Sequence, residues 1–504
     1  MVTRESTCRV TGSTWTRWFT ALVSFAVMFV LAGCARHSEN GLARVRRTHT
    51  LRWGGDMQGG EPYVFEDPNG GGGLVGFEVD LANALARELG VHAQFVQNDW
   101  PNLVPALDRG TFDIAMNGLE VTPTRAAQVS FTRPYFLFSL RLMARRDDNR
   151  IRGLASVRGL RVGTLANSAA WHLLVARGAL PQPYDGSVEV YDDLESGRID
   201  AVLLDDIVAM RYGQTRPALR VVDDVQDGYY AIGVQRGDDE LRAELDTALN
   251  RIAQSGELRR ILDHWNIDSE REGRMVHWTE TQTREMLSTS SSQRFTWMHV
   301  LLFLKAAVVT LVVSLASMIL AIPLGMGLAL ARLYGPKFAG ALAAGYVELF
   351  RGTPVLLQLY VLYFGLGKII QLDAFTAAVL GLGLNYGAYE AEVYRAGIQA
   401  VPKGQMEAAV SLGMSTSLAL RRIVMPQAFR LALPSVTNDF IALLKDSSLV
   451  SVITVVELTK RTNIAAENTG SWLVPGVLCA TLYFAMGYPL SRLARRLEAK
   501  LARS

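Results

Sequence analysis

The chain has 504 residues, and its 51 Lys and Arg nearly balance its 48 Asp and Glu, which leaves a formal net charge of +3. So small a net charge does not suggest a protein that binds nucleic acid. Hydrophobic residues make up 49 % and charged residues 20 %, which is too apolar for a wholly soluble protein and too charged for a wholly membrane-embedded one. We therefore expect several units of different character.

The N-terminal segment 1–34 has the layout of an export signal. Several arginines precede an apolar stretch over 18–31, and Leu-Ala-Gly-Cys stands at 31–34. A basic segment, a short apolar segment and small residues together are typical of a secretory signal. The tetrapeptide resembles a bacterial lipobox, which implies lipidation of Cys34; an uncleaved signal anchor with an incidental cysteine is the alternative. Either way, we expect the tether over 35–47 and the domain after it to lie outside the cytoplasmic membrane.

Residues 48–268 predict an α/β domain. Short apolar runs indicate strands, and helical patterns such as 77–89 lie between them; the runs cover 50–54, 91–96, 112–116, 161–164 and 201–204. Strands that alternate with helices favour largely parallel sheets. Such sheets bind ligands at the loops beyond the carboxyl ends of their strands.

Several motifs in this region follow the order found in a known family. They are Gly-Phe-Glu-Val-Asp-Leu at 76–81, Trp-Pro-Asn-Leu at 100–103, Phe-Asp-Ile-Ala at 112–115, Thr-Pro-Thr-Arg at 122–125, Phe-Thr-Arg-Pro-Tyr at 131–135 and Gly-Arg-Ile-Asp-Ala-Val at 197–202. On these motifs, residues 51–265 resemble the polar amino-acid-binding periplasmic proteins. The resemblance implies a two-lobed clamshell that closes on its ligand by a hinge motion.

An amino acid carries a carboxylate and an ammonium, so a cleft that binds it needs one cation and one anion. Arginine suits the carboxylate because its planar guanidinium makes two parallel hydrogen bonds. Arg125 matches the carboxylate-binding arginine of the family, and Asp205 resembles its ammonium-binding aspartate. A surface arginine at a helix start and a helix-capping aspartate are the structural alternatives, and Asp206 is a competing register for Asp205.

The same resemblance implies further ligand-binding positions, namely Asp56, Trp100, Asn117, Gly118, Glu120 and Ser168. Asn117 and Gly118 match positions whose backbone groups face the ligand, while Trp100 is either a wall of the cleft or purely structural. Glu120 stands where many relatives carry a small hydroxyl residue. We expect Glu120 and Glu61 to add negative charge to the cleft and to favour a ligand with a basic or amide side chain.

Two stretches depart from the family pattern. A stacking aromatic usually stands a few positions after Asp56, but one extra residue here leaves the alignment of Tyr63 open. In the second lobe a Gly-Thr-Thr loop is replaced by Ala-Asn-Ser-Ala at 166–169, so only Ser168 is carried over. The resemblance therefore predicts that the ligand is an amino acid, but it says less about which side chain that amino acid carries.

A polar linker over 269–294 leads to an apolar C-terminal region, 295–504. Its Ser- and Thr-rich sequence is typical of a flexible tether. Five apolar runs of spanning length come next, near 299–331, 340–366, 373–398, 428–456 and 472–492. Basic residues such as Arg332 and Lys403 stand at the ends that this topology places in the cytoplasm, which agrees with the positive-inside bias. We expect an all-α, five-span transmembrane domain in contact with lipid.

Motifs in this region resemble the polar amino-acid ABC permeases. They are Arg-Gly-Thr-Pro at 351–354 and the segments 389–398, 404–413 and 445–449. The resemblance implies a separate ATPase subunit that consumes the ATP, and a second permease copy, most simply in a homodimer. It also implies an ATPase-coupling loop made by Gly404, Glu407, Ala408, Ala409 and Gly413.

Two expectations concern side chains of the C-terminal region. The coupling loop predicts a short helix with a small-residue face, Ala408 and Ala409, that ends at Gly413. Glu390, Glu392 and Arg395 predict ion pairs that hold helices in register rather than contacts to substrate.

Other function classes fit the sequence less well. The sequence has no Gly-x-x-x-x-Gly-Lys-[Ser/Thr] loop for ATP, no evident metal-ligand cluster and no nucleophile triad, so we expect neither an enzyme nor a bound cofactor. A ligand-gated channel would interrupt the clamshell with its pore, and a sensor would carry a signalling domain. The prediction is amino-acid uptake at the inner membrane, with the clamshell on the extracytoplasmic face.

Overall fold

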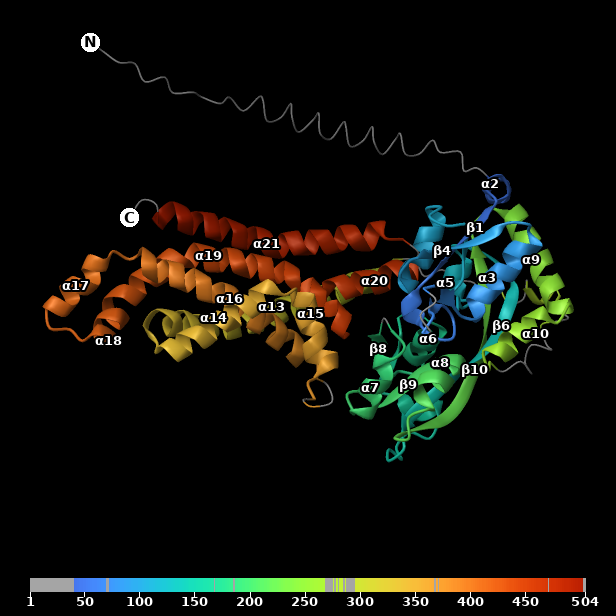
Figure 1. Ribbon diagram of the computed structural model, residues 1–504, viewed down its shortest axis with the longest axis horizontal. Coiled ribbons are helices and arrows are strands. Elements are labelled where there is room, and N and C mark those ends of the chain that lie inside the picture. The colour runs from blue at the N-terminus through green and yellow to red at the C-terminus, as the bar shows by residue number, and fades with distance from the viewer. Residues whose placement is uncertain are drawn as a thin grey trace, which may run out of the picture.

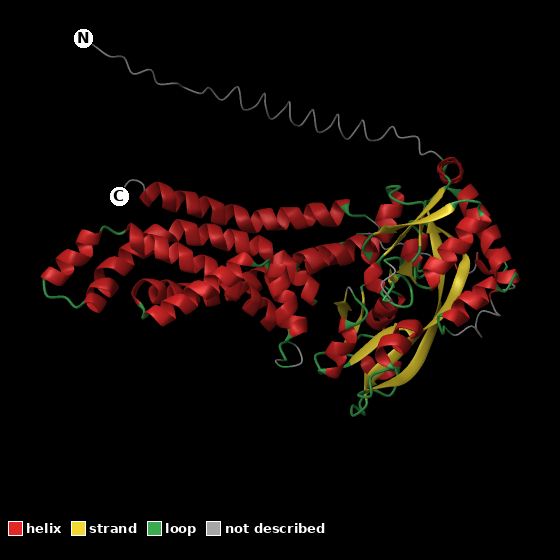
Figure 2. Cartoon of the chain, in the orientation of Figure 1, coloured by secondary structure: helices red, strands yellow, loops and turns green. Residues whose placement is uncertain are grey.

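The computed structural model describes residues 40–501 apart from positions 69–71, 167, 185, most of 268–294, 367–368, 370 and 470. The predicted signal with Cys34 lies outside the described residues, as does most of the predicted linker. Figures 1 and 2 show an α/β domain beside an elongated helical domain, with the two in contact at one end of the helices.

One eight-stranded sheet, in the order β4-β1-β5-β10-β6-β9-β7-β8, runs through the α/β domain. The strands are β1 (Thr50–Gly55), β4 (His92–Gln97), β5 (Ile114–Ala115), β6 (Ser130–Arg145), β7 (Arg161–Leu165), β8 (Leu180–Tyr184), β9 (Ala201–Asp205) and β10 (Leu219–Val234), and β2 (Phe65–Glu66) pairs separately with β3 (Leu74–Val75). β1 is parallel to β4 and β5, and β7 is parallel to β8 and β9. The predicted parallel pairing is confirmed within these two groups.

Two long antiparallel strands, β6 and β10, join the groups. Near one end of the pair Val234 lies opposite Ser130, and near the other Leu219 lies opposite Arg145. We define lobe 1 as residues 40–138 with 228–267, and lobe 2 as 139–227, because Phe138 pairs with Gly228 at the middle of these strands. Two adjacent strands that pass from one lobe to the other form the hinge of a clamshell-like fold. The sequence did not predict them.

Helices cover both lobes. In lobe 1 they are α2 (Gly41–Thr48), α3 (Phe77–Glu88), α4 (Leu103–Asp108), α5 (Pro123–Ala126), α9 (Asp239–Gln254) and α10 (Glu257–His264), and in lobe 2 α6 (Ala169–Ala176), α7 (Glu189–Glu195) and α8 (Asp206–Val208). α3 shows the principle: Phe77, Leu81 and Leu85 recur every four residues, so all three lie on one buried face.

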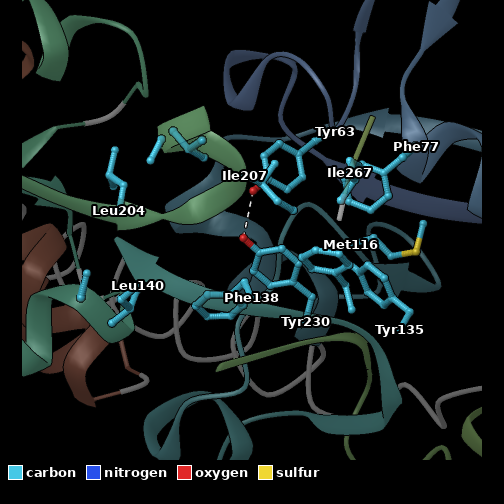
Figure 3. Packing of buried hydrophobic residues seen from close by; sticks show 14 of the residues in the cluster. Tyr63, Phe77, Met116, Tyr135, Phe138, Leu140, Leu204, Ile207, Tyr230 and Ile267 are labelled. Atoms are coloured by element: carbon cyan, nitrogen blue, oxygen red, sulfur yellow. Dashed lines mark hydrogen bonds between the residues drawn. The ribbon is translucent and has the colours of Figure 1, made fainter. Parts of the chain in front are cut away.

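The hinge region is packed with aromatic side chains, as Figure 3 shows. Tyr230 of β10 stacks on Phe138 of β6 with 4.6 Å between ring centroids. Its hydroxyl lies 2.9 Å from that of Tyr63, on the lobe 1 side. These contacts place a rigid floor under the space between the lobes.

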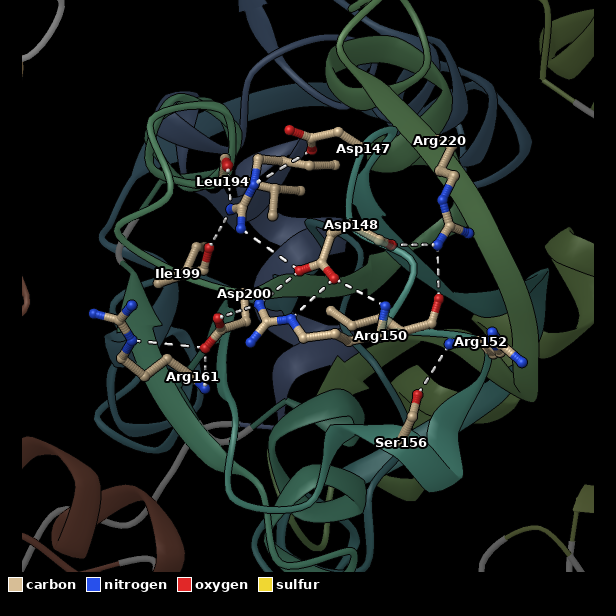
Figure 4. Close-up of polar contacts among 12 residues, drawn as sticks. Asp147, Asp148, Arg150, Arg152, Ser156, Arg161, Leu194, Ile199, Asp200 and Arg220 are labelled. Carbon is tan, nitrogen blue, oxygen red and sulfur yellow. Dashed lines mark hydrogen bonds and ion pairs between the residues drawn. The ribbon is translucent and has the colours of Figure 1, made fainter.

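An ion-pair network, shown in Figure 4, lies where β6 has ended and β9 is about to begin. Asp148 accepts hydrogen bonds from Arg150, with 2.7 Å to the nearer guanidinium nitrogen, and these bonds lower the pKa of Asp148 to about 2. Arg150 also reaches Asp200, directly before β9. Asp200, at the start of β9, lies in this network, whereas Asp205 ends the strand. The carboxyl end of β9 therefore points away from the network and toward lobe 1, where a ligand site is expected.

The helical domain contains α13 (Trp297–Tyr334), α14 (Lys337–Gly352), α15 (Val355–Tyr360), α16 (Ala374–Ala400), α17 (Lys403–Ser411), α18 (Thr416–Ala419), α19 (Met425–Asp446), α20 (Leu458–Thr469) and α21 (Leu473–Leu501). Within the described part of the chain, two helices are long and apolar enough to cross a membrane, α13 and the segment 473–496 of α21. The other three predicted spans coincide with helices that are shorter or more polar.

Close packing of α13 against α16 relies on small residues. A Cβ atom added at Gly383 would come within 2.7 Å of Leu320, and one at Gly387 within 2.6 Å of Leu324. Small residues let two helix backbones approach closely where side-chain burial alone gives little driving force.

Both lobes contact the helical domain, lobe 1 through α5 against α20 and lobe 2 through polar and apolar side chains. Asp193 of α7 accepts a hydrogen bond from the Tyr363 hydroxyl at 2.7 Å, and the Arg198 guanidinium lies over the Tyr363 ring, 4.5 Å from its centroid. A second, apolar contact packs Trp171 of α6 near Ile464 of α20. The sequence predicted neither α20 nor these contacts.

Candidate functional site

A cavity lies between the two lobes, above the aromatic floor. Its lining comprises Asp56, Gly59, Tyr63, Trp100, Asn117, Gly118, Glu120, Leu165, Ser168, Ser187, Leu204, Asp205 and Val208. The free volume is about 40 Å³, which accommodates about three water molecules. All the predicted ligand-binding residues except Arg125 are in this lining. The two lobes thus face each other across a narrow cavity.

Asp205 ends β9 and reaches the cavity from lobe 2. The Tyr230 hydroxyl donates a hydrogen bond to its carboxylate. Burial, and then the nearby Glu120 carboxylate, raise the pKa of Asp205 well above its ordinary value. The competing residue, Asp206, is not in the lining, and its carboxylate accepts from the backbone N–H of Ile207.

Glu120 and Arg125 form a pair on the lobe 1 side of the cavity. The Arg125 guanidinium nitrogen Nη1 lies 3.3 Å from Glu120 Oε2, and the guanidinium stacks on the Trp100 ring at 4.3 Å from its centroid. The same Oε2 accepts a 2.9 Å hydrogen bond from the backbone N–H of Ala169 in lobe 2. Burial raises the pKa of Glu120, and the positive charge of Arg125 partly offsets that rise.

Asp56 is a buried hub at the end of β1. Its Oδ2 accepts from the Trp100 backbone N–H at 2.8 Å, and its Oδ1 accepts from Gln97 Nε2 at 3.0 Å. The Trp100 indole in turn donates to the Asn117 carbonyl at 3.0 Å. These bonds fix the wall of the cavity that Asp56 and Trp100 form.

Asn117 and Gly118 come after β5 with positive φ angles of 141° and 56°. The Asn117 amide oxygen accepts from the Asp56 N–H at 2.9 Å. The Gly118 N–H donates to the buried carboxylate of Glu78 at 2.7 Å. Burial raises the pKa of Glu78 from its ordinary value of 4.5 to about 7. The backbone groups of this turn are thus held by the protein itself, at the edge of the cavity.

Ser168 caps the N-terminus of α6. Its hydroxyl accepts from the Trp171 N–H at 3.1 Å and donates to the Leu165 carbonyl at 2.9 Å. This cap fixes the first turn of α6, and so the position of the Ala169 N–H beside Glu120.

Glu61 lies differently from the expectation. It is not in the lining of the cavity but forms an ion pair with Arg211, which joins lobe 1 to lobe 2. Because its charge is neutralised by Arg211, Glu61 adds no net negative charge to the cavity.

A larger cavity, with a free volume of about 500 Å³, lies among α14, α15, α16 and α19. Its polar lining includes Arg351 on one side and Asp439 and Asp446 of α19 on the other. The Tyr386 hydroxyl donates to Asp446 at 2.7 Å. This cavity therefore offers both a cation and carboxylates within the helical domain.

The predicted coupling loop forms α17 and the turn after it. Figure 1 shows α17 at the end of the helical domain farthest from the α/β domain. Gly404, Glu407 and Ala408 are exposed, whereas Ala409 is buried, so the two alanines do not share one face as expected. The helix ends at Ser411, and Gly413 adopts a left-handed φ of 84°. A glycine in this conformation just after a helix is a common way for a helix to end.

The predicted ion pairs of α16 are confirmed only in part. Glu392 pairs with Arg332 of α13 and, at 2.6 Å, with Arg395. Glu390 is buried beside Gly325, and no arginine or lysine among the described residues forms an ion pair with its carboxylate. It does not belong to the ion-pair set.

Comparison with known proteins gives the chain a family. Residues 51–268 match bacterial extracellular solute-binding proteins, family 3, and residues 321–503 match binding-protein-dependent transport system inner membrane components. The chain is 36 % identical over 200 residues to the arginine transport system permease protein ArtQ of Bacillus subtilis, which covers 39 % of this chain and 91 % of that protein. The chain belongs to the amino-acid ABC transporters.

A second relative of the transporter is a putative glutamine transport system permease protein, GlnP, of Rickettsia bellii. It is 35 % identical over 204 residues, covering 40 % of the transporter and 94 % of the relative. Among solved structures, an ancestral arginine-binding protein bound to arginine is 31 % identical, with a TM-score of 0.40, over 43 % of the transporter and 98 % of that chain. An amino acid ABC transporter with histidines is 38 % identical, with a TM-score of 0.38, over 40 % and 94 %.

The transporter is thus a solute-binding domain fused to an inner-membrane permease, and it takes up amino acids. Its relatives are permease and binding components of transport systems and not enzymes. The solute-binding domain is of the extracellular type.

Several residues in and behind the transporter's cleft were not identified from its sequence. Glu78 and Tyr230 are buried partners of the predicted residues Gly118 and Asp205. Ser187 comes from a loop without a motif. The available sequence signal for Glu78 was its place next to Phe77 in the Gly-Phe-Glu-Val-Asp-Leu motif, on the apolar face of α3.

Proposed function

We propose that the cleft between the lobes is the site where the transporter captures its amino acid, and that the ligand has a basic or amide side chain. The observation that carries this proposal is the charge of the lining. Asp56 and Asp205 contribute two carboxylates from the two facing lobes, neither of which forms an ion pair with a described arginine or lysine, and Glu120 contributes a third that is paired with Arg125. A ligand with two positively charged or hydrogen-bond-donating groups matches such a lining better than an acidic one.

Within this cleft Asp205 serves as the partner of the ligand's ammonium. Its place at the carboxyl end of β9 and its exposure to the cavity support this role. Arg125 and the Ala169 N–H form the anion-binding pair of the cleft, since both contact one carboxylate oxygen. Trp100 holds the guanidinium by stacking, and Ser168 positions the amide.

The permease passes the ligand through the cavity among α14, α16 and α19. Arg351, Asp439 and Asp446 support this role because a zwitterion needs a cation and an anion at each stage of its path. The domain crosses the membrane five times, by α13, α14 with α15, α16, α19 and α21, in contact with lipid. Two permease copies, most simply a homodimer, complete the pathway.

ATP hydrolysis reaches the permease through α17 and the turn after it. Glu407 and Ala408 are exposed at the end of the domain opposite the solute-binding domain. An exposed short helix with a sharp glycine ending fits a groove in a partner protein. Its contacts with the ATPase would move the helices of the pathway.

The domain boundaries are 48–268 for the receptor and 295–504 for the permease, and Cys34 carries the lipid anchor.

Uptake into proteoliposomes tests this proposal. The full chain is reconstituted with its ATPase, and uptake of radiolabelled arginine, glutamine and glutamate is compared with and without ATP. We expect ATP-dependent uptake of arginine or glutamine well above that of glutamate. Uptake of glutamate alone would show that the acidic lining does not select the ligand.

A further inference from the structure

The anion that occupies Arg125 belongs to the protein itself. Glu120 Oε2 accepts from Arg125 Nη1 at 3.3 Å and from the Ala169 N–H at 2.9 Å. Arg125 belongs to lobe 1 and Ala169 to lobe 2, so one carboxylate oxygen is held by both lobes. A ligand carboxylate that bridged the lobes would need these same two donors.

Burial makes this contact hard to exchange. The Glu120 side chain is 4 % exposed and that of Arg125 is 11 % exposed. The Trp100 ring covers one face of the guanidinium, and Nη1 also donates to the Glu120 carbonyl at 3.2 Å. A buried ion pair loses several kcal/mol when one partner is left alone. Arg125 therefore keeps Glu120 unless another carboxylate takes its place.

A ligand carboxylate competes with Glu120 at a disadvantage. Glu120 is five positions from Arg125 in the same chain, so its effective concentration at the guanidinium is on the order of millimolar or higher. The carboxylate of a free ligand at micromolar concentration must therefore bind Arg125 much more tightly than Glu120 does in order to displace it. Among the described residues that line the cavity, three are acids and none is a lysine or arginine. The cavity thus offers a cationic ligand group several partners and a carboxylate few.

We propose that Glu120 is a specificity-determining residue that takes the place of the ligand's carboxylate between Arg125 and Ala169. The ligand is recognised by its cationic groups, and its carboxylate adds little to affinity. This inference rests on the proposed function, since it requires that the cleft is the ligand site. It widens the ligand class to amines with at least one ammonium, of which basic amino acids are a subset.

The test compares arginine with argininamide, in which a neutral amide replaces the carboxylate. Binding of both is measured by calorimetry on the full chain in nanodiscs, at about pH 6, where the α-amino group of both is protonated. Wild type is compared with Glu120→Ser, which removes the tethered carboxylate, and with Glu120→Gln, which keeps its length without the charge. Arg177→Ala, an exposed arginine of lobe 2, is the control.

We expect the two ligands to bind wild type within about threefold of each other. In Glu120→Ser the freed Arg125 should favour arginine by about tenfold or more, the usual value of a charge-assisted hydrogen bond. In Glu120→Gln the ratio of the two affinities should lie between those of wild type and Glu120→Ser. This variant replaces Glu120→Ser in the test if the serine variant does not fold. A preference for arginine above tenfold in wild type, or an unchanged ratio in both variants, would overturn the inference. If none of the twenty amino acids binds wild type or Glu120→Ser, the proposed ligand site is itself wrong.

Discussion

The Tyr363 hydroxyl donates a 2.7 Å hydrogen bond to the Asp193 carboxylate, and this bond joins the permease to lobe 2 of the solute-binding domain. Asp193 also accepts from the Tyr184 hydroxyl at 2.6 Å and from Arg198 at 2.7 Å. The carboxylate is fully buried in this contact. The solute-binding domain therefore contacts the helical domain of its own chain through a buried polar cluster, beside the apolar contact of Trp171 with Ile464.

Replacing Tyr363 by phenylalanine should weaken this docking without affecting the cleft. A hydrogen bond to a charged group contributes about 1.5–3 kcal/mol, so we expect ATP-driven uptake to fall by about tenfold while ligand affinity stays unchanged. Tyr334→Phe, which removes an exposed hydroxyl from the end of α13, is the matched control. Equal uptake by Tyr363→Phe and wild type would mean that this contact has no part in transport.

Substitutions in the turn after α17 should separate binding from transport. Glu407→Lys reverses an exposed charge, and Gly413→Val forces a β-branched residue into a left-handed φ of 84° at a cost of about 1–2 kcal/mol. We expect normal ligand affinity with strongly reduced ATP-driven uptake in both variants. Glu66→Lys, an exposed charge reversal in β2, controls for charge alone. Loss of ligand binding in the α17 variants would contradict the separate roles of the two domains.

Arg125→Ala should abolish ligand binding. The substitution leaves the Glu120 carboxylate buried without its cation, which costs about 3–5 kcal/mol, and removes one of the two donors that bridge the lobes. We expect affinity to fall by at least about 100-fold in calorimetry on the full chain. The double variant Arg125→Ala with Glu120→Ala leaves no buried charge unpaired, so we expect it to recover most of the lost ligand affinity. If its affinity stays as low as that of Arg125→Ala alone, Arg125 contacts the ligand directly.

Glu78 should make the solute-binding domain less stable as the pH rises. Its pKa is raised from 4.5 to about 7 in the folded protein, so between these values the folded state binds more protons than the unfolded state. The free energy of unfolding should therefore fall with rising pH across this window, by about 3 kcal/mol. In Glu78→Gln this part of the pH dependence should disappear. Pulse proteolysis of the full chain in urea, at about pH 5 and about pH 8, measures the difference; identical pH dependence in both proteins would contradict the assignment.

The sequence predicted which positions surround the cleft better than how they interact. Asp205 and Trp100 were found because each ends or follows a strand in a recognisable motif. The pairing of Glu120 with Arg125 was not predicted, because it depends on side-chain conformation and on the Ala169 N–H from the other lobe. The same limit applies to Glu61, whose partner Arg211 lies 150 positions further along the chain.

The fold was predicted in its local elements and less well in its long-range pairing. β1 and β9 appear as short apolar runs, whereas β6 and β10 are 16 residues long and cross between the lobes. Their outer ends carry charged residues such as Arg141 and Asp224, which pair across the two strands at 2.6 Å. Cross-strand ion pairs replace the apolar pattern that predicts a strand, so β10 has no clear signal in the sequence.

The central claim is that the fused domain captures a cationic or amide amino acid, and ligand profiling tests it most directly. Thermal unfolding of the full chain in nanodiscs would be measured with each of the twenty amino acids. We predict clear stabilisation by arginine, lysine, histidine or glutamine and none by aspartate or glutamate. Stabilisation by aspartate and glutamate alone, or by no amino acid, would contradict the claim.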